Sequence, residues 1–185
     1  MKNKAVFIDR DGVINKNLFD ETAGIKSPSK PSEFVLLPGV AQAIKTLKKA
    51  GLKIVIVSNQ PGVAFGYIKD SMLNEITKKM NSKIKVDAVY YCKHHPSYTG
   101  ECECRKPKEG LLKKAAKELG IDISKSYAVG DNLIDIEAGK KCKKTFLVAF
   151  NFDTINQIKA KGVKADYYVH NLHEAAKIIE KLEVG

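Results

Sequence analysis

Six short runs of apolar, often β-branched residues alternate with longer amphipathic stretches along the 185-residue chain. The runs lack the polar alternation of half-exposed strands and are typical of strands buried on both faces of a parallel sheet. They are Ala5–Ile8, Ile54–Val57, Ala88–Tyr91, Tyr127–Val129, Phe146–Ala149 and Tyr167–Val169. This alternation predicts an α/β fold with a Rossmann-like, doubly wound parallel sheet.

Most of the intervening stretches carry apolar residues at helical spacing. The predicted helices cover residues 40–47, 72–80, 111–119 and 172–182, with a short one over 134–138. Gly51 and Gly120 suit helix ends. Pro107 suits the first turn of the third helix, because its missing N–H is not needed there.

Residues 1–185 are expected to form a single domain, since the length is ordinary for one domain and no linker or internal repeat interrupts the pattern. The segment from Asn17 to Leu37 is the exception. It contains Gly24, Pro28 and Pro31 and has no clear period. We expect a long loop insert over one edge of the domain, and long loops in compact domains are often functional.

The formal net charge is +11, from 32 Lys and Arg against 21 Asp and Glu. Such a balance attracts nucleic acid or phosphorylated substrates. The lysines are spread along the predicted helices, however, which favours a solvated surface and makes a nucleic-acid partner unexpected. The apolar runs are far shorter than the roughly 20 residues of a membrane span. With no signal-like N-terminal segment, we expect a cytoplasmic monomer without a membrane partner.

The first predicted strand leads directly into Asp9-Arg10-Asp11-Gly12. Ligands of open α/β sheets bind beyond the carboxyl ends of the strands, so both carboxylates lie where chemistry is expected. One carboxylate can attack phosphorus while the other transfers the proton of the leaving or incoming oxygen. Gly12 permits a tight turn and a close backbone approach.

Two further segments offer groups that can bind an anion. The second strand ends in Ser58-Asn59, where a hydroxyl and backbone N–H groups can hold a phosphate. Lys106 precedes the helix expected to open at Pro107, so that a cation and free helix N–H groups face the same ligand. An ordinary polar turn would also explain either one alone.

The fourth strand ends in Gly130-Asp131, and Asp135 follows four residues later. Asp131 lies at the same edge of the sheet as Asp9 and can complete an Mg²⁺ site with it. Because four such features occur in order at strand ends, they predict one phosphate-handling site with a small phosphorylated metabolite as its ligand.

This quartet resembles the four motifs of the haloacid dehalogenase superfamily of phosphatases, over roughly residues 4 to 150. The resemblance implies that Asp9 is the nucleophile and Asp11 the general acid and base. It implies that Ser58 and Lys106 bind the transferring phosphoryl group. It also implies a magnesium site made of Asp9, Asp131 and the backbone carbonyl of Asp11, with Asp135 in a supporting role.

A cysteine-rich segment, the zinc loop of residues 92–104, lies between the second and third motifs. Its pattern is Cys92-x-His94, seven residues, then Cys102-x-Cys104. Residues two apart in an extended segment face the same side, so both residues of each pair can bind the same metal ion. One His and three Cys form a closed set that indicates structural Zn²⁺. His95 is a competing ligand, disfavoured by its spacing, and reduced surface thiols are the alternative without metal.

With this loop the chain resembles a capless subgroup, the heptose bisphosphate phosphatases and the similar histidinol-phosphatase domains. Arg105 lies directly after the zinc loop and is expected to bind phosphate as a second cation beside Lys106. Asn59 is expected to contact the substrate. The chain departs from the subgroup at Phe65, where arginine is usual, and at Asn132, where a charged residue is frequent. The 17–37 segment also looks longer than its counterpart.

The expected reaction is hydrolysis of a small phosphomonoester through an aspartyl-phosphate. The leading substrate is a sugar phosphate or bisphosphate such as D-glycero-D-manno-heptose 1,7-bisphosphate, with histidinol phosphate second. A nucleic-acid 3′-phosphatase is the second possible function, since such enzymes share the same catalytic motifs. The third is a binding module stabilised by zinc that has no catalytic activity.

Overall fold

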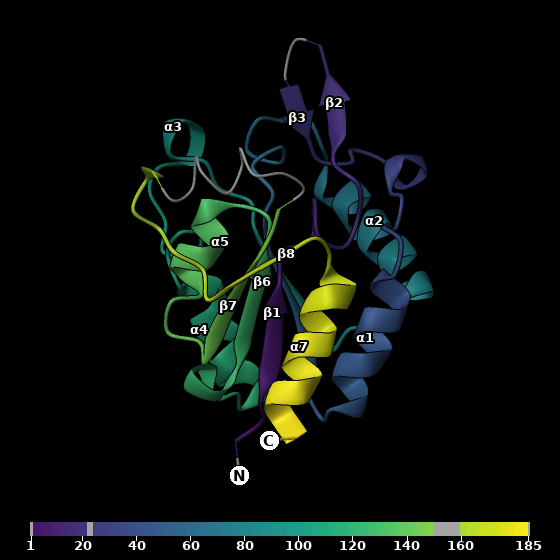
Figure 1. Ribbon diagram of the computed structural model, residues 1–185. Coiled ribbons are helices and arrows are strands. Elements are labelled where there is room, and N and C mark those ends of the chain that lie inside the picture. The colour runs from purple at the N-terminus through teal and green to yellow at the C-terminus, as the bar shows by residue number, and fades with distance from the viewer. Residues whose placement is uncertain (1, 22–23, 150–159, 185) are drawn as a thin grey trace.

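The computed structural model describes residues 2–21, 24–149 and 160–184. Within them lies a six-stranded sheet in the order β5-β4-β1-β6-β7-β8, with every neighbouring pair parallel (Figure 1). The strands are β1 (Ala5–Ile8), β4 (Lys53–Asn59), β5 (Ala88–Cys92), β6 (Tyr127–Gly130), β7 (Lys144–Val148) and β8 (Tyr167–Val169). All six predicted runs form strands of one sheet, so the predicted fold class is confirmed.

Helices cover both faces of this sheet. One face packs against α1 (Val40–Lys49), α2 (Asp70–Lys83) and α7 (Leu172–Val184), and α1 and α7 lie side by side (Figure 1). The other face packs against α4 (Gly110–Leu119) and the end of α5 (Leu133–Ala138). Strand β1 serves both cores, because successive side chains of a strand point to opposite faces. Val6 and Ile8 enter the first core, and Ala5 and Phe7 the second.

Helix α4 begins at Gly110, so the expectation that Pro107 opens it was wrong. The residues before it are held in a turn, in which the N–H of Lys108 donates to the carbonyl of Arg105 at 2.9 Å. Lys106 is also tied to β4 by its backbone, as described below. The local turn and the contact of Lys106 with the distant strand β4 together outweigh the preference of proline for a first helical turn.

The 17–37 segment is not a plain loop, and that expectation needs correction. It contains an antiparallel hairpin of β2 (Leu18–Asp20) and β3 (Gly24–Lys26), followed by a 3₁₀ turn over Pro31–Glu33. The hairpin projects beyond the carboxyl ends of the sheet strands (Figure 1). It therefore stands over the expected site. Two further short elements, α3 (Pro96–Thr99) and a 3₁₀ turn over Ile123–Lys125, were not predicted.

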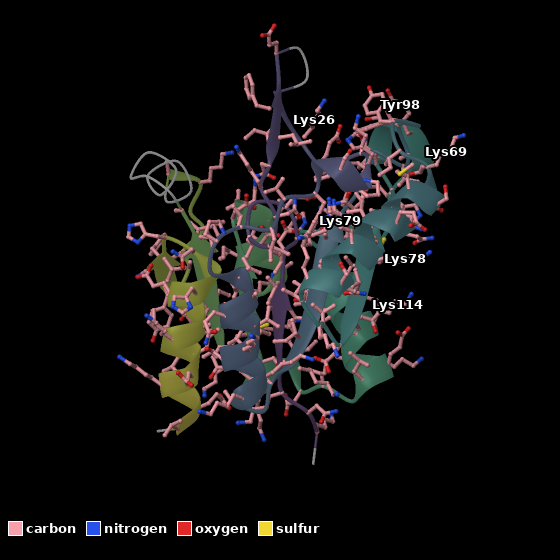
Figure 2. The ribbon with its side chains drawn as sticks, turned by 90° about the vertical axis from the view of Figure 1, so that its right-hand side faces the viewer. Lys26, Lys69, Lys78, Lys79, Tyr98 and Lys114 are labelled. Carbon is pink, nitrogen blue, oxygen red and sulfur yellow. The ribbon has the colours of Figure 1, made fainter. Side chains whose placement is uncertain are left out.

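The lysines are spread over several elements, as Figure 2 shows for Lys26 in β3, Lys69, Lys78 and Lys79 at the start of α2 and within it, and Lys114 in α4. Several have partners nearby. Lys78 pairs with Glu75 at 2.7 Å, Lys79 donates to the carbonyl of Pro31, and Lys114 lies 5.8 Å from the ring centre of Tyr90. Their distribution agrees with a solvated surface. No helix among the described residues is long and apolar enough to span a membrane.

Candidate active site and cysteine cluster

Three carboxylates meet at the carboxyl ends of β1 and β6. Asp9 directly follows β1, and its N–H donates to the carbonyl of Val129 in β6 at 2.9 Å. Asp131 directly follows β6, and Asp135 lies in the first turn of α5. One oxygen of each of these three carboxylates lies within 4.8 Å of the others. Asp135, expected only in a supporting role, thus belongs to the cluster itself.

Lys106 is the cation of this site. Its ammonium group is buried and donates to Asp9 Oδ1 at 2.6 Å, to Asp135 Oδ1 at 2.5 Å and to the carbonyl of Val57 at 2.8 Å. The side-chain amide of Asn59 pairs with both the N–H and the carbonyl of Lys106, each at 3.0 Å. Asn59, expected to touch the phosphate, therefore holds the lysine segment against β4.

The positive charge of Lys106 does not balance the negative charge of the three carboxylates in the cluster. Burial, followed by the charges of neighbouring carboxylates, raises the pKa of Asp131 to about 8. Burial likewise raises the pKa of Asp9, to about 6, although Lys106 opposes the shift. Burial alone would lower the pKa of Lys106, but Asp135 and Asp9 outweigh it and raise that pKa. Three hard oxygen donors that repel one another make a set that suits Mg²⁺.

Asp11 has a different environment from Asp9. Its carboxylate accepts from Arg10 Nε at 3.1 Å and Nη2 at 2.9 Å, and from Asn15, Ser27 and Gln60 at 2.7 to 2.9 Å. Burial raises the pKa of Asp11, but the charge of Arg10 and these hydrogen bonds outweigh it and lower the pKa. The carboxylate of Asp11 is thus ionised and held from several sides, apart from the three-carboxylate cluster. Its backbone carbonyl as a metal ligand stays a prediction.

Two glycines allow these loops to approach each other. A Cβ atom on Gly12 would lie 1.9 Å from Asp131 Oδ2, and its φ of 84° is left-handed. A Cβ atom on Gly130 would lie 2.1 Å from the Cβ of Asp135. Any larger residue at either position would push the carboxylates out of place.

A cavity of about 350 Å³ opens onto the cluster. Besides the carboxylates and Lys106, its lining includes Ser58, Asn132 and Ser27. Ser58 is buried and accepts from Gln60 Nε2 at 3.2 Å. Its position beside Asp9 and Lys106 agrees with the predicted phosphate-binding role.

A second cavity of about 620 Å³ adjoins the first, since Ile25 and Ser27 line both. Phe65 lines this second cavity and packs against His95 and Tyr98, each with ring centres 4.8 Å away. Phe65 thus packs against its aromatic neighbours and at the same time forms part of a cavity wall.

Arg105 does not line the cavity at the carboxylate cluster. Its Nη1 donates to the carbonyl of His94 at 3.2 Å, within the zinc loop. In this arrangement it contacts the zinc loop, and a role in binding phosphate requires its side chain to move.

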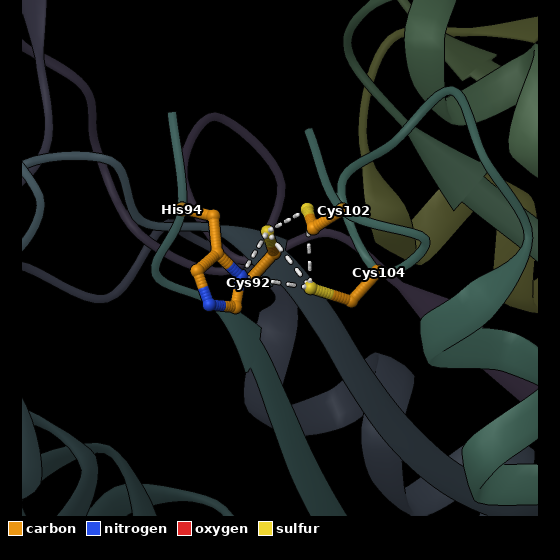
Figure 3. Close-up of side chains that lie close together, drawn as sticks. All are labelled: Cys92, His94, Cys102 and Cys104. Atoms are coloured by element: carbon orange, nitrogen blue, oxygen red, sulfur yellow. Dashed lines mark hydrogen bonds between the residues drawn. The ribbon is translucent and has the colours of Figure 1, made fainter. Parts of the chain in front are cut away.

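The four residues of the expected zinc set gather in one cluster (Figure 3). The Sγ atoms of Cys92, Cys102 and Cys104 lie 3.1 to 3.7 Å apart, and His94 Nδ1 lies 3.2 Å from Cys104 Sγ and 3.8 Å from Cys92 Sγ. Four soft donors at these separations suit a tetrahedral metal with bonds of about 2.0 to 2.3 Å. His95 instead caps α3, accepting from the N–H of Ser97.

Sequence reasoning missed several residues that hold Asp11. Arg10 and Gln60 are buried, Asn15 is buried on the same turn, and Ser27 follows the hairpin. The sequence offered one signal for this arrangement, namely the position of Arg10 between Asp9 and Asp11. A buried arginine needs a carboxylate partner, so a pairing of Arg10 with one of these residues could have been predicted. Nothing in the sequence places Ser27 near Asp11.

Comparison with known proteins agrees with this geometry. The profile of the haloacid dehalogenase-like hydrolase family matches residues 18–143. The D-glycero-beta-D-manno-heptose-1,7-bisphosphate 7-phosphatase of Haemophilus influenzae is 34% identical over 98% of this chain and 99% of that protein. The D-glycero-alpha-D-manno-heptose-1,7-bisphosphate 7-phosphatase of Campylobacter jejuni is 37% identical over 82% of this chain and 84% of that protein.

Among solved structures, the D,D-heptose 1,7-bisphosphate phosphatase from B. bronchiseptica, complexed with magnesium and phosphate, gives a TM-score of 0.81. It is 30% identical, and the match covers 97% of this chain and 99% of that one. The predictions of an α/β fold and of a phosphatase of this superfamily are thus confirmed. The chain belongs to the haloacid dehalogenase-like hydrolase family.

Proposed function

We propose that this chain is a magnesium-dependent phosphatase that removes the 7-phosphate of D-glycero-D-manno-heptose 1,7-bisphosphate. The observation that carries the proposal is the cluster of buried Asp9, half-buried Asp131 and buried Asp135, with Lys106 bonded to two of its members. The similar phosphatases described above indicate the substrate, and they include enzymes for both the beta and the alpha anomer.

In the first step a carboxylate oxygen of Asp9 attacks phosphorus, and the bond from phosphorus to the sugar oxygen breaks. Lys106 and Ser58 bind the equatorial oxygens of the transferring group. Mg²⁺, held by Asp9, Asp131 and Asp135, would neutralise the developing negative charge and let the carboxylate approach the phosphate. The products are an aspartyl-phosphate on Asp9 and the heptose 1-phosphate, with a free hydroxyl group at carbon 7.

Asp11 handles the protons of both steps. A protonated Asp11 gives its proton to the departing sugar oxygen, and the resulting carboxylate then takes a proton from the water that attacks the aspartyl-phosphate. The pairing with Arg10 favours the ionised carboxylate, which suits the second step. Protonation of Asp11 before the first step is therefore the less favourable half of the cycle.

We also propose that the cluster of Cys92, His94, Cys102 and Cys104 holds one structural Zn²⁺. A complete set of four protein ligands leaves no open position for substrate. The metal would fix the segment that leads into Arg105 and Lys106. The expected monomer, single domain and cytoplasmic location stay predictions.

The proposal is tested by measuring kcat/KM for phosphate release from both anomers of the heptose bisphosphate, from heptose 7-phosphate and from histidinol phosphate. The kcat/KM of the heptose substrates should exceed that of histidinol phosphate by at least about tenfold, the effect of losing one charged or hydrogen-bonded contact. Addition of Mg²⁺ should be required. A preference for histidinol phosphate would contradict the proposed substrate, and turnover without Mg²⁺ would contradict the proposed mechanism.

A further inference from the structure

Arg10 is the largest fully buried side chain among the described residues. Its Nε and Nη2 donate to the two different oxygens of the Asp11 carboxylate, at 3.1 and 2.9 Å. Such a two-bond contact fixes the plane of a carboxylate as well as its charge. The orientation of Asp11 therefore depends on what holds the other side of the Arg10 guanidinium.

Tyr91, in β5, holds that other side. Arg10 Nη1 lies 3.4 Å from the Tyr91 hydroxyl, which lies 2.9 Å from Thr77 Oγ1 in α2. The Thr77 hydroxyl in turn lies 2.9 Å from the carbonyl of Leu73. The guanidinium carbon is also 5.4 Å from the Tyr91 ring centre, within the range of a cation–π contact.

The directions of these hydrogen bonds follow from the chemistry of the groups. Arginine can only donate and a carbonyl can only accept, and each hydroxyl carries one proton. Arg10 therefore donates to Tyr91, Tyr91 to Thr77, and Thr77 to the carbonyl of Leu73. Donation thus starts at Arg10, which donates to Asp11 on one side and to Tyr91 on the other, and from Tyr91 it continues to the carbonyl of Leu73 in α2. This network connects α2 with Asp11 and passes across β4, which lies between β5 and β1 in the sheet.

We propose that Tyr91 is a positioning residue for the reaction, acting on Asp11 through Arg10, with Thr77 fixing the Tyr91 hydroxyl. This inference rests on the proposed phosphatase function. Tyr91 transfers no proton itself. It sets the angle at which the Asp11 carboxyl gives its proton to the leaving oxygen and, once ionised, takes one from water.

The test is Tyr91→Phe, which keeps the ring and removes the hydroxyl. Its matched control is Tyr90→Phe, at the neighbouring strand residue, whose hydroxyl donates to Glu118 at 2.7 Å. Activity is measured on glycerol 2-phosphate, whose leaving alkoxide needs a proton, and on p-nitrophenyl phosphate, whose leaving group departs without one. Neither substrate depends on the heptose assignment, so an error there leaves this test intact.

For Tyr91→Phe, kcat on glycerol 2-phosphate should fall by about 3- to 10-fold, the equivalent of one ordinary hydrogen bond. The loss on p-nitrophenyl phosphate should be smaller, and KM should stay as in the wild type. Thr77→Val should act in the same direction and more weakly, and Tyr90→Phe should change neither rate. Equal losses on both substrates, or the same losses in Tyr90→Phe, would overturn the proposal.

A double-mutant cycle provides the second measurement. In an Asp11→Asn background, Tyr91→Phe should cost nothing further in kcat, because the residue through which it acts is already altered. If the two losses multiply instead, Tyr91 acts through packing and not through Asp11.

Discussion

Lys106 Nζ lies 2.6 Å from Asp9 Oδ1, so a buried ammonium group contacts the carboxylate that we propose attacks phosphorus. The same nitrogen lies 2.5 Å from Asp135 Oδ1. The ammonium group thus pairs with two of the three carboxylates in the cluster, and the site needs further positive charge whenever all three are ionised.

Replacing this lysine should therefore affect stability as well as activity. Lys106→Met leaves Asp9 and Asp135 buried without their partner, and breaking a buried ion pair costs about 3–5 kcal/mol of unfolding free energy. The measurement is urea unfolding in the presence of Mg²⁺. The control is Lys113→Met, whose exposed pair with Glu109 is worth less than about 1 kcal/mol. Equal effects of the two substitutions would show that Lys106 has no special electrostatic role.

The metal-free protein should lose stability as the pH rises. The folded-state pKa values of Asp9, about 6, and Asp131, about 8, lie above the ordinary carboxyl value. Between pH 4 and pH 8 the folded state thus binds more protons than the unfolded state, and the unfolding free energy falls with rising pH. The check is the unfolding free energy at pH 5, 6.5 and 8 in buffer stripped of divalent cations.

Added Mg²⁺ should reduce that slope, because a bound cation favours ionised carboxylates. Asp131→Asn should also reduce it without any metal. A metal-free protein whose stability rises from pH 5 to pH 8, with or without Asp131→Asn, would contradict the raised pKa values.

Sequence patterns predicted the fold and most of the site because both depend on strand ends. Six buried runs define the sheet, and parallel strands bring the residues that follow them, such as Asp9, Ser58 and Asp131, to one edge. The zinc set was equally local, since all four ligands lie within 13 residues. No knowledge of distant contacts was needed for either.

The errors involve contacts between distant segments. The start of α4 at Gly110 accompanies the pairing of Lys106 with Asn59, 47 positions away in the sequence. The hairpin has strands of three residues each, too short for an alternating pattern to appear. Arg10 contacts Tyr91, 81 positions away, and Asp11 accepts a hydrogen bond from Gln60, 49 positions away. The sequence therefore could not place the hydrogen-bond donors around Asp11.

Zinc should be bound by the purified protein at about one ion per chain, the capacity of one site with four ligands. Cys102→Ser should lower the zinc content and the melting temperature, because structural zinc contributes directly to folding. Cys142→Ser is the control, since Cys142 lies outside the cluster and should leave the zinc content unchanged. Elemental analysis decides the matter, and protein purified without chelators that contains no zinc would rule out the structural metal.

Phe65 should weaken the preference for a second, distal phosphate. Its aromatic ring lines the cavity of about 620 Å³ that adjoins the cavity at the carboxylate cluster. The heptose bisphosphate phosphatases and histidinol-phosphatase domains that this chain resembles usually have arginine at this position. Phe65→Arg should shift kcat/KM toward the bisphosphate over the heptose 7-phosphate by about 10- to 150-fold, the effect of one charge-assisted contact. If the wild type already prefers the bisphosphate strongly and the variant changes nothing, Phe65 is only packing.

The central claim is that Asp9 forms a covalent phosphoryl intermediate. Asp9→Asn should lower turnover by at least about 10³-fold, as expected for a nucleophile that acts as part of a unit. Loss of activity alone does not identify the intermediate, however, because Asp9 is also a proposed metal ligand.

Trapping the intermediate is therefore the most direct measurement. Asp11→Asn, which should slow hydrolysis of the aspartyl-phosphate, is mixed with substrate and Mg²⁺, quenched and reduced with borohydride, which converts an acyl phosphate of aspartate to homoserine. Mass spectrometry of the peptides should find homoserine at position 9, only in the sample with substrate. Homoserine at another aspartate, or an unmodified Asp9 in an enzyme that turns over during the reaction, would contradict the account.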